Sequence, residues 1–296
     1  MAQKLHHEQP DKFPDPNHKP EIAVALSRFE AFVGWKPLRD ISVLFNIPGL
    51  RELVPEVPTG WTDDTLRTVT RRLLQADSGL VRLIEAELMN LSKRDLEDLD
   101  HQSYILDLIP RLQSQYDATD PGTLVALLCM NYLVLEPGEA LYIPADSIHA
   151  YLSGDIVECA ARSTNAMRSG FCPRADRDDV ELFTEALTFA QHHRDDARLL
   201  CRPSEAGLRG RTVVYQPPIR EFDLLRVELA PGQEEEVSAA RGPAVAIITK
   251  GEGVLGGDGR EFTVTEGFVF FVAPGTAVRW RTESGLQVYM PVVEST

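Results

Sequence analysis

His149 is the residue of this chain whose type and setting most clearly suggest chemistry. It ends the pattern G-x5-P-x-D-x-x-H, which runs from Gly138 through Pro144 and Asp146. Alternating apolar residues around this pattern predict short strands joined by a tight turn. Such a turn can hold an imidazole at the mouth of a small barrel, where metal sites are common. The alternative interpretation is that His149 only closes a turn.

Two further residues that could take part in chemistry, Lys19 and Glu21, lie near the start of the chain in the segment NHKPE at 17–21. Pro20 favours an extended conformation for Lys19, and side chains two residues apart in an extended segment point to the same side. Lys19 and Glu21 should therefore share a face. They are either a surface ion pair or a metal-ligating carboxylate beside a cation that binds substrate.

The elements that position these residues begin as strands. Residues 1–20 are rich in Pro, Asp, His and Lys and are expected to form an extended loop. EIAVAL at 21–26 and FEAFVGWKPL at 29–38 then look like interior strands. A barrel strand that enters without a preceding partner leads us to expect missing sequence upstream.

Between about residues 39 and 131 the apolar spacing becomes helical. Thr62 and Ser78 can each cap a helix, and Asp120 followed by proline can begin another. Pro110 predicts a break or kink in a further helix. These apolar stripes are expected to be the core of a packed helical subdomain. Another helix is expected after residue 174, ending at His192.

From Thr212 onward the chain has closely spaced strand patterns with Gly- or Pro-bearing turns, which predict an all-β barrel or sandwich. No histidine follows His193, and a barrel without imidazoles is a poor site for a catalytic transition metal. The motif GEGVLGG at 251–257 lies between strands and therefore predicts a hairpin rather than a nucleotide site. This region is expected to be structural or to form one wall of an active cleft.

Composition narrows the class of protein. A chain of 296 residues is long enough for two or three packed units. Its net charge of -15 argues against general nucleic-acid binding but not against a small anionic substrate. No apolar run reaches the length of a membrane span, and no secretory signal is visible. The four cysteines form no C-x-x-C pair, so we expect reduced thiols in a cytoplasmic protein. From the charge and the lack of a membrane span, we expect neither membrane nor nucleic-acid partners.

Taken in order, several segments strongly resemble type I mannose-6-phosphate isomerase, a cupin family. They are NHKPE at 17–21, FVGWKPL at 32–38, LEPGEALYIPADSIHAYLSGDIVE at 135–158, NAMRSGFCPR at 165–174 and the histidine-free β region. The most specific is the segment at 135–158, which resembles the second half of the cupin signature with Asp146 at a usual glycine position.

The resemblance implies a fold that is mainly β with a helical insert (α+β). It contains an incomplete catalytic cupin barrel, a helical subdomain and a C-terminal cupin-like β barrel. The expected boundaries are a remnant of the catalytic cupin domain at 1–38, the helical subdomain at 39–131, the catalytic domain continued at 132–200, and a C-terminal domain without metal at 201–296.

The resemblance also implies roles for single residues. Glu21 and His149 match ligands of one zinc ion, and Arg168 matches an arginine assigned to catalysis. The expected substrate-binding residues are Lys19, Tyr151 and Arg174. The implied substrate is a small sugar phosphate, and we expect the chain to be a monomer.

The implied reaction is the interconversion of mannose 6-phosphate and fructose 6-phosphate, which leads to GDP-mannose and glycosylation. A proton must leave one carbon and return to its neighbour, through an enediolate with charge on oxygen. Zinc can stabilise that charge, and Arg168 can add electrostatic stabilisation. The general base stays open between a desolvated lysine and a zinc-bound water.

Two departures from the family pattern have consequences. A Q-x-H segment that carries two further zinc ligands is absent and would lie before Met1, so this chain alone is expected to have reduced or no activity. Thr164 replaces the acidic residue of an S-D-N triplet four positions before Arg168. The alternative hypothesis is a non-catalytic cupin that binds a sugar phosphate or a protein partner. A metal-dependent cupin oxygenase is disfavoured because a histidine-rich triad is lacking.

Overall fold

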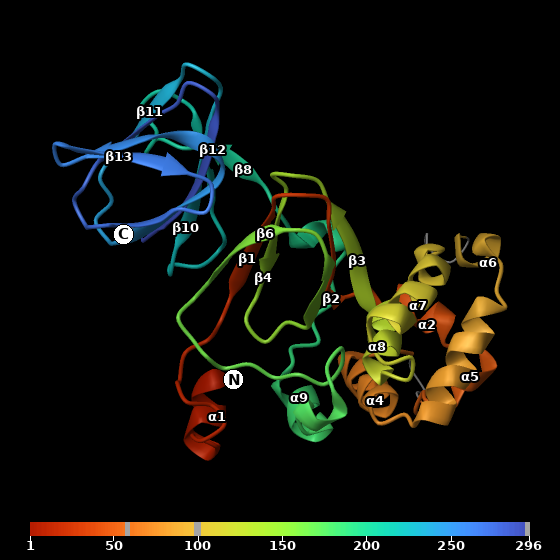
Figure 1. Cartoon of the computed structure of the whole chain (residues 1–296). Helices are drawn as coiled ribbons and strands as arrows, with labels where there is room; N and C mark the ends of the chain where they lie inside the picture. The colour runs from red at the N-terminus through yellow and green to blue at the C-terminus, as the bar shows by residue number, and fades with distance from the viewer. Residues whose placement is uncertain (57–59, 98–101, 294–296) are drawn as a thin grey trace.

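The computed structural model describes residues 1–56, 60–97 and 102–293 of the chain. Figure 1 shows a curled pair of β-sheets in the middle, a group of helices on one side and a C-terminal β body on the other. The helices are α1 (Ala2–Glu8), α2 (Leu38–Leu44), α3 (Pro48–Arg51), α4 (Asp63–Leu74), α5 (Ser78–Met89), α6 (Lys93–Glu97), α7 (Tyr104–Gln115), α8 (Pro121–Cys129) and α9 (Val180–Ala186), with 3-10 turns at Arg174–Asp176 and Arg194–Ala197.

The strands fall into two bodies. Those of the central body, called here the half-barrel, are β1 (Glu21–Ala25), β2 (Phe29–Trp35), β3 (Met130–Leu135), β4 (Ala140–Ile143), β5 (His149–Ser153), β6 (Ile156–Ala160) and β7 (Arg198–Leu199). Those of the C-terminal barrel are β8 (Cys201–Pro203), β9 (Thr212–Tyr215), β10 (Asp223–Leu229), β11 (Glu234–Val237), β12 (Ala244–Gly257), β13 (Arg260–Thr265), β14 (Val269–Val272), β15 (Val278–Arg281) and β16 (Leu286–Val292).

The half-barrel consists of two antiparallel sheets with strand orders β6-β1-β4-β7 and β3-β2-β5. Their facing sides enclose an apolar core made of Ala25, Phe29, Ala31, Val33, Leu133, Leu135, Leu141, Ile143 and Ala197. Within the described residues, β5 pairs only with β2, and β6 pairs only with β1. The two sheets therefore curl around a shared interior without closing it completely.

The helices cover the outer face of β2 and β3. α8 lies at the centre of this group, and all nine of its residues are buried. Asp120 accepts a hydrogen bond from the Gly122 backbone N–H at 2.8 Å, and Pro121 occupies the first helical position. Both features favour helix initiation, because the first turn has unpaired N–H groups and proline needs none. α8 then leads directly into β3.

The C-terminal barrel curls around its own apolar core, at whose centre Trp280 is fully buried. β12 makes this possible because its first half pairs with β14 and β16, and its second half pairs with β13 and β15. An irregularity in the pairing between Ile248 and Lys250 marks the change. The segment at 251–257 lies within β12 and forms a hairpin with β13, as expected from the sequence.

The two β bodies meet at a joint that combines apolar packing with hydrogen bonds. Ile22 of β1 and Leu224 of β10 belong to one buried cluster. The Tyr215 hydroxyl donates to the Gly138 carbonyl oxygen at 2.7 Å, and it accepts from the Arg226 guanidinium at 3.0 Å. The turn before β4 is thus attached directly to the C-terminal barrel.

The expected fold class, mainly β with a helical insert and an incomplete barrel, is confirmed. The expectation of a loop over residues 1–20 is wrong for Ala2–Glu8, which form α1. This short helix depends on tertiary contacts that sequence periodicity does not show. Leu5 is buried against the rest of the molecule, and the His6 ring bonds to the Phe13 carbonyl oxygen at 2.6 Å. No helix in the described part of the chain is long and apolar enough to cross a bilayer.

Three smaller expectations need correction. The N-cap of α5 is Asp77 rather than Ser78, because the Asp77 carboxylate accepts from two backbone N–H groups of the first turn. Pro110 lies inside α7 without breaking it, on the exposed side of the helix. α9 ends at Ala186 rather than at His192, because the next residues leave the helix to bond with the turn before β5.

Candidate active site

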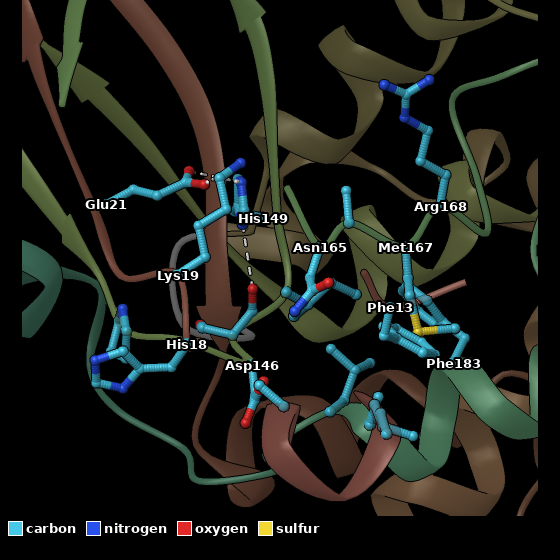
Figure 2. A pocket seen from close by; sticks show the side chains of 18 of the residues that line it. Phe13, His18, Lys19, Glu21, Asp146, His149, Asn165, Met167, Arg168 and Phe183 are labelled. Atoms are coloured by element: carbon cyan, nitrogen blue, oxygen red, sulfur yellow. Dashed lines mark hydrogen bonds and ion pairs between the residues drawn. The ribbon is translucent and has the colours of Figure 1, made fainter. Parts of the chain in front are cut away.

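A cavity of about 420 Å³ lies at the open end of the half-barrel. Its walls come from segments far apart in the sequence: α1 and the loop after it, the start of β1, the turn before β5, the loop after β6, and α9. Figure 2 shows side chains from these segments gathered around one space, with the side chain of Arg168 directed away from Glu21 and His149. A concave site of this size is typical for a small-molecule ligand.

Glu21, Lys19 and His149 form the polar centre of this cavity. Glu21 begins β1 and its side chain is only 8% exposed. Its two carboxylate oxygens face different partners: Lys19 Nζ lies 3.0 Å from Oε1, and His149 Nε2 lies 3.5 Å from Oε2. The structure therefore brings His149 together with Lys19 and Glu21, which the spacing patterns had indicated separately.

The turn before β5 fixes the orientation of the His149 ring. His149 Nδ1 lies 3.1 Å from the Ser147 carbonyl oxygen, which can only accept a hydrogen bond. The proton of a neutral ring therefore sits on Nδ1, and the lone pair on Nε2 faces Glu21. Asp146 lies in this turn with φ of +62°, a left-handed conformation that aspartate tolerates better than most residues. This tolerance explains how aspartate occupies a position where glycine was expected.

Tyr151 lies on the same face of β5 as His149, with the two ring centroids 5.6 Å apart. Its hydroxyl donates to Glu158 Oε1 at 2.9 Å. Burial, followed by the charge of Glu158 and this hydrogen bond, raises the pKa of Tyr151 well above its usual value. The phenol is therefore a protonated donor at neutral pH. Its oxygen keeps lone pairs that can accept from a ligand hydroxyl.

Glu158 is a residue that the sequence reasoning missed. In the β1–β6 pairing it stands opposite Ala23, on the same sheet face as Glu21. The sequence signal was the alternation along β6. Ile156, Glu158 and Ala160 share one face of the strand, and Val157 and Cys159 point to the other. A second carboxylate thus faces the interior of the half-barrel.

Arg168 lines the same cavity from the loop that follows β6. Figure 2 shows its guanidinium on the side of the cavity away from the Glu21–His149 pair. Its backbone is held on both sides by Asp178: the Arg168 N–H donates to Asp178 Oδ2 at 2.7 Å, and the Asp178 N–H donates to the Arg168 carbonyl oxygen at 2.7 Å. The loop position is therefore well defined even though the side chain is exposed.

Arg174 is not among the residues that line the cavity. It lies in a 3-10 turn, and its guanidinium donates to Ser78 Oγ at the start of α5, at 3.1 Å. The geometry thus gives the expected role of Arg174 in substrate binding no support. That role stays a prediction from resemblance.

The donor types at the cavity centre fit zinc, but their number is small. A carboxylate oxygen and an imidazole lone pair that face each other at 3.5 Å repel unless a proton or a cation lies between them. Across residues 1–56, 60–97 and 102–293, however, no group of three or more His, Cys, Asp or Glu side chains is placed to hold a metal. Catalytic zinc normally has three protein ligands. Glu21 and His149 supply two.

Comparison with known proteins identifies the family. Residues 1–38 match the model of the phosphomannose isomerase type I catalytic domain. A mannose-6-phosphate isomerase of Schizosaccharomyces pombe is 34% identical over 290 residues, which cover 92% of this chain and 69% of the relative. The chain belongs to the mannose-6-phosphate isomerase family. A relative from Cryptococcus neoformans with the same name is also 34% identical and covers 100% of this chain, which spans 74% of that relative.

Solved structures of mannose-6-phosphate isomerases share the fold. A zinc-bound mannose 6-phosphate isomerase superposes with a TM-score of 0.80 at 22% identity, over 99% of this chain and 73% of its own. A variant of phosphomannose isomerase from Salmonella typhimurium gives a TM-score of 0.78 at 24% identity, over 99% and 72%. At this level of identity the likeness establishes architecture alone. The resemblance inferred from the sequence is thus confirmed for both family and fold.

Proposed function

We propose that this chain interconverts mannose 6-phosphate and fructose 6-phosphate in the cavity at the open end of the half-barrel. The proposal rests on the convergence of Lys19, Glu21 and His149 in space. Lys19 and Glu21 precede the helical insert in the sequence, and His149 follows it. A cation, a carboxylate and an oriented imidazole in one concave site match the needs of a substrate that carries both hydroxyls and a phosphate.

We propose further that Glu21 and His149 are two ligands of one zinc ion. Zinc, when bound there, supplies a Lewis acid for a carbonyl oxygen. The Ser147 carbonyl holds His149 in the tautomer that leaves Nε2 free, as is usual for metal-binding imidazoles. The remaining coordination positions belong to groups other than this pair, since two donors do not complete a catalytic set.

The other polar side chains in and beside the cavity bind and orient the sugar. Tyr151 lines the cavity and donates to Glu158, an exposed carboxylate outside the lining, and the Tyr151 hydroxyl keeps lone pairs for sugar hydroxyls. Arg168 lines the cavity on the side away from Glu21, and its guanidinium supplies the positive charge that stabilises negative charge developing on substrate oxygen. Lys19 adds a second cation beside Glu21.

The test is turnover of the zinc-loaded chain with mannose 6-phosphate. Arg168→Ala should lower kcat/KM by about a hundredfold or more, as expected for loss of one preorganised electrostatic group. Arg220→Ala is the matched control, because Arg220 is an exposed arginine outside the cavity. Equal activity of both variants would contradict the assigned role of Arg168.

The presence of only two zinc donors favours a second candidate function, which is to bind a sugar phosphate without isomerising it. Such a protein needs the cavity but not a complete zinc site. Calorimetry with mannose 6-phosphate separates the candidates. Binding without turnover, in protein shown to contain zinc, supports the binding module, whereas turnover excludes it.

We also propose that the protein works as a monomer in the cytoplasm, where its reaction supplies precursors of GDP-mannose. The four cysteine side chains are free thiols. Burial raises the pKa of Cys129 and of Cys159 to about 12, so both thiols stay protonated and unreactive at neutral pH. Light scattering tests the monomeric state. Thiol titration of native protein tests whether the cysteines are reduced, as expected in the cytoplasm.

A further inference from the structure

Arg168 is carried by an irregular segment, residues 163–178, which we call the strap. The strap runs from the end of β6 to the start of α9 and contains no strand, only the 3-10 turn at Arg174–Asp176. Its internal hydrogen bonds are local and include the pair between the Arg168 backbone and Asp178. The placement of the strap relative to the cavity therefore depends on contacts with other parts of the molecule.

Asp15, in the loop between α1 and β1, provides the densest set of these contacts. Its Oδ1 accepts from the Ser163 hydroxyl at 2.9 Å. Its Oδ2 accepts from the Thr164 backbone N–H at 2.9 Å and from the Thr164 hydroxyl at 3.3 Å. The Asn165 side-chain amide donates to the Asp15 carbonyl oxygen at 2.8 Å. One residue thus binds three consecutive residues at the start of the strap.

A second anchor joins the same loop to the far part of the strap. Lys12 Nζ lies 2.7 Å from Asp178 Oδ1, while Asp178 Oδ2 accepts from the Arg168 backbone N–H at 2.7 Å. Lys12 and Asp15 therefore bind the strap on either side of Arg168, and Asp120 adds a third anchor through the Phe171 N–H at 2.8 Å and the Arg177 guanidinium at 3.0 Å. The loop after α1 also lines the cavity through Phe13 and Asn17.

The chemistry of these contacts requires the ionised form of Asp15. Hydrogen bonds, above all the one from the Thr164 backbone N–H, lower the pKa of Asp15 below its ordinary value despite an opposing effect of burial. Every strap group that faces the carboxylate is a donor. An amide in its place would turn one of its ends, an NH2 group, against those donors.

We propose that Asp15 is a positioning residue of the isomerase reaction: its carboxylate fixes the strap and so places Arg168 at the cavity. This inference rests on the function proposed above, because the role of Arg168 belongs to that function. Asp15 itself does not line the cavity. Its effect on the reaction is therefore indirect.

The first measurement compares Asp15→Asn with Asp11→Asn in turnover of mannose 6-phosphate. Asp11 is a matched control because it is an exposed aspartate in the same loop, outside the cavity. Asp15→Asn should lower kcat by about tenfold or more, with a smaller change in KM, because misplaced catalytic groups cost rate more than binding. Asp11→Asn should behave as wild type.

The second measurement reverses the contact. In the double variant Asp15→Asn, Thr164→Asp, the carboxylate lies on the strap and the amide on the loop, so that donor and acceptor exchange places across the former 3.3 Å contact. Recovery of at least half of the lost activity supports positioning. If neither kcat nor thermal midpoint recovers, Asp15 is only a structural residue and the proposal is wrong.

The third measurement does not depend on catalysis. Arg168 and Arg174 are exposed trypsin sites within the strap. Asp15→Asn should increase the rate of cleavage after these residues by about tenfold, and the double variant should restore it. If the wild-type chain proves inactive, the proposed function fails, yet this result still decides whether Asp15 orders the strap. Cleavage of Asp15→Asn at the wild-type rate would overturn the inference.

Discussion

The half-barrel and the C-terminal barrel use the same antiparallel architecture but fill their interiors differently. The C-terminal barrel packs a continuous apolar core around Trp280. The half-barrel has an apolar core on one side of its interior, and its open end presents polar side chains that include Glu21, His149 and Tyr151. A barrel filled with hydrocarbon serves as a scaffold, whereas one left partly empty and polar can hold a ligand.

The two β bodies also differ in how each surrounds a buried carboxylate, Glu235 in the C-terminal barrel and Glu21 in the half-barrel. Glu235 of the C-terminal barrel is fully buried and accepts from four neighbouring groups: the backbone N–H groups of Arg209, Arg211 and Glu236, and the Thr212 hydroxyl. Glu21 is nearly as buried but faces a lysine, an imidazole and a cavity. A saturated carboxylate is structural, and one with free lone pairs can bind a metal or a ligand.

The largest expected effect concerns zinc and follows from this difference. Glu21→Ala should lower zinc affinity by about a hundredfold or more and abolish measurable turnover, since it removes one of two identified donors. Zinc content after dialysis, measured by atomic absorption, checks this directly. Glu205→Ala, at an exposed glutamate of the C-terminal barrel, should retain wild-type zinc content. Retention of zinc by Glu21→Ala would break the comparison.

The next largest effect is on stability. Trp280→Ala removes a fully buried indole from the C-terminal barrel and should lower the free energy of unfolding by about 3–5 kcal/mol. Denaturant titration measures this loss. Zinc content of the protein that remains folded should be unchanged, because Trp280 lies in the scaffold. A selective loss of zinc at unchanged stability would contradict that assignment.

A pH dependence of similar size is expected from Glu30 of β2. Burial raises the pKa of this carboxyl, but hydrogen bonds from Arg111, Ser153, Tyr132 and Arg28 outweigh burial and lower it to about 2. The resulting stability is present above the unfolded-state pKa and is lost as pH falls toward 2. Its size is on the order of a few kcal/mol. Glu30→Gln should be less stable at neutral pH, with a flatter profile between pH 5 and 2 in denaturant titrations.

The smallest expected effect comes from the outer face of the C-terminal barrel. Phe271 is 71% exposed on β14. Phe271→Ser should change the free energy of unfolding by no more than about 0.5 kcal/mol, because the ring buries little area. Turnover should also stay at the wild-type level. A loss of activity without a loss of stability would show that this barrel has a functional face after all.

Local spacing predicted one part of the site. The extended conformation expected beside Pro20 placed Lys19 with Glu21, and the structure brings their charged groups to 3.0 Å. Tyr151, expected from the resemblance, lies on the same face of β5 as His149. Their catalytic and binding roles stay predictions, as does the division into four segments at 1–38, 39–131, 132–200 and 201–296.

Other features depend on contacts between distant segments and could not be predicted from local patterns. α1 needs the burial of Leu5 against the rest of the molecule. Asp15 gains its role only where the loop before β1 meets the loop after β6. Thr164, which stands where an acidic residue was expected, bonds to the Asp15 carboxylate from another part of the chain, a contact that spacing alone does not predict.

Gly138 has a consequence beyond the turn that it begins. Its φ of +88° suits glycine, and a β-carbon there would collide with the Arg226 guanidinium. The glycine therefore leaves room for the Arg226 guanidinium, which bonds to Tyr215 in the joint between the C-terminal barrel and the turn before β4. An arginine of one β body thus occupies the space that a side chain at position 138 would take in the body that carries His149.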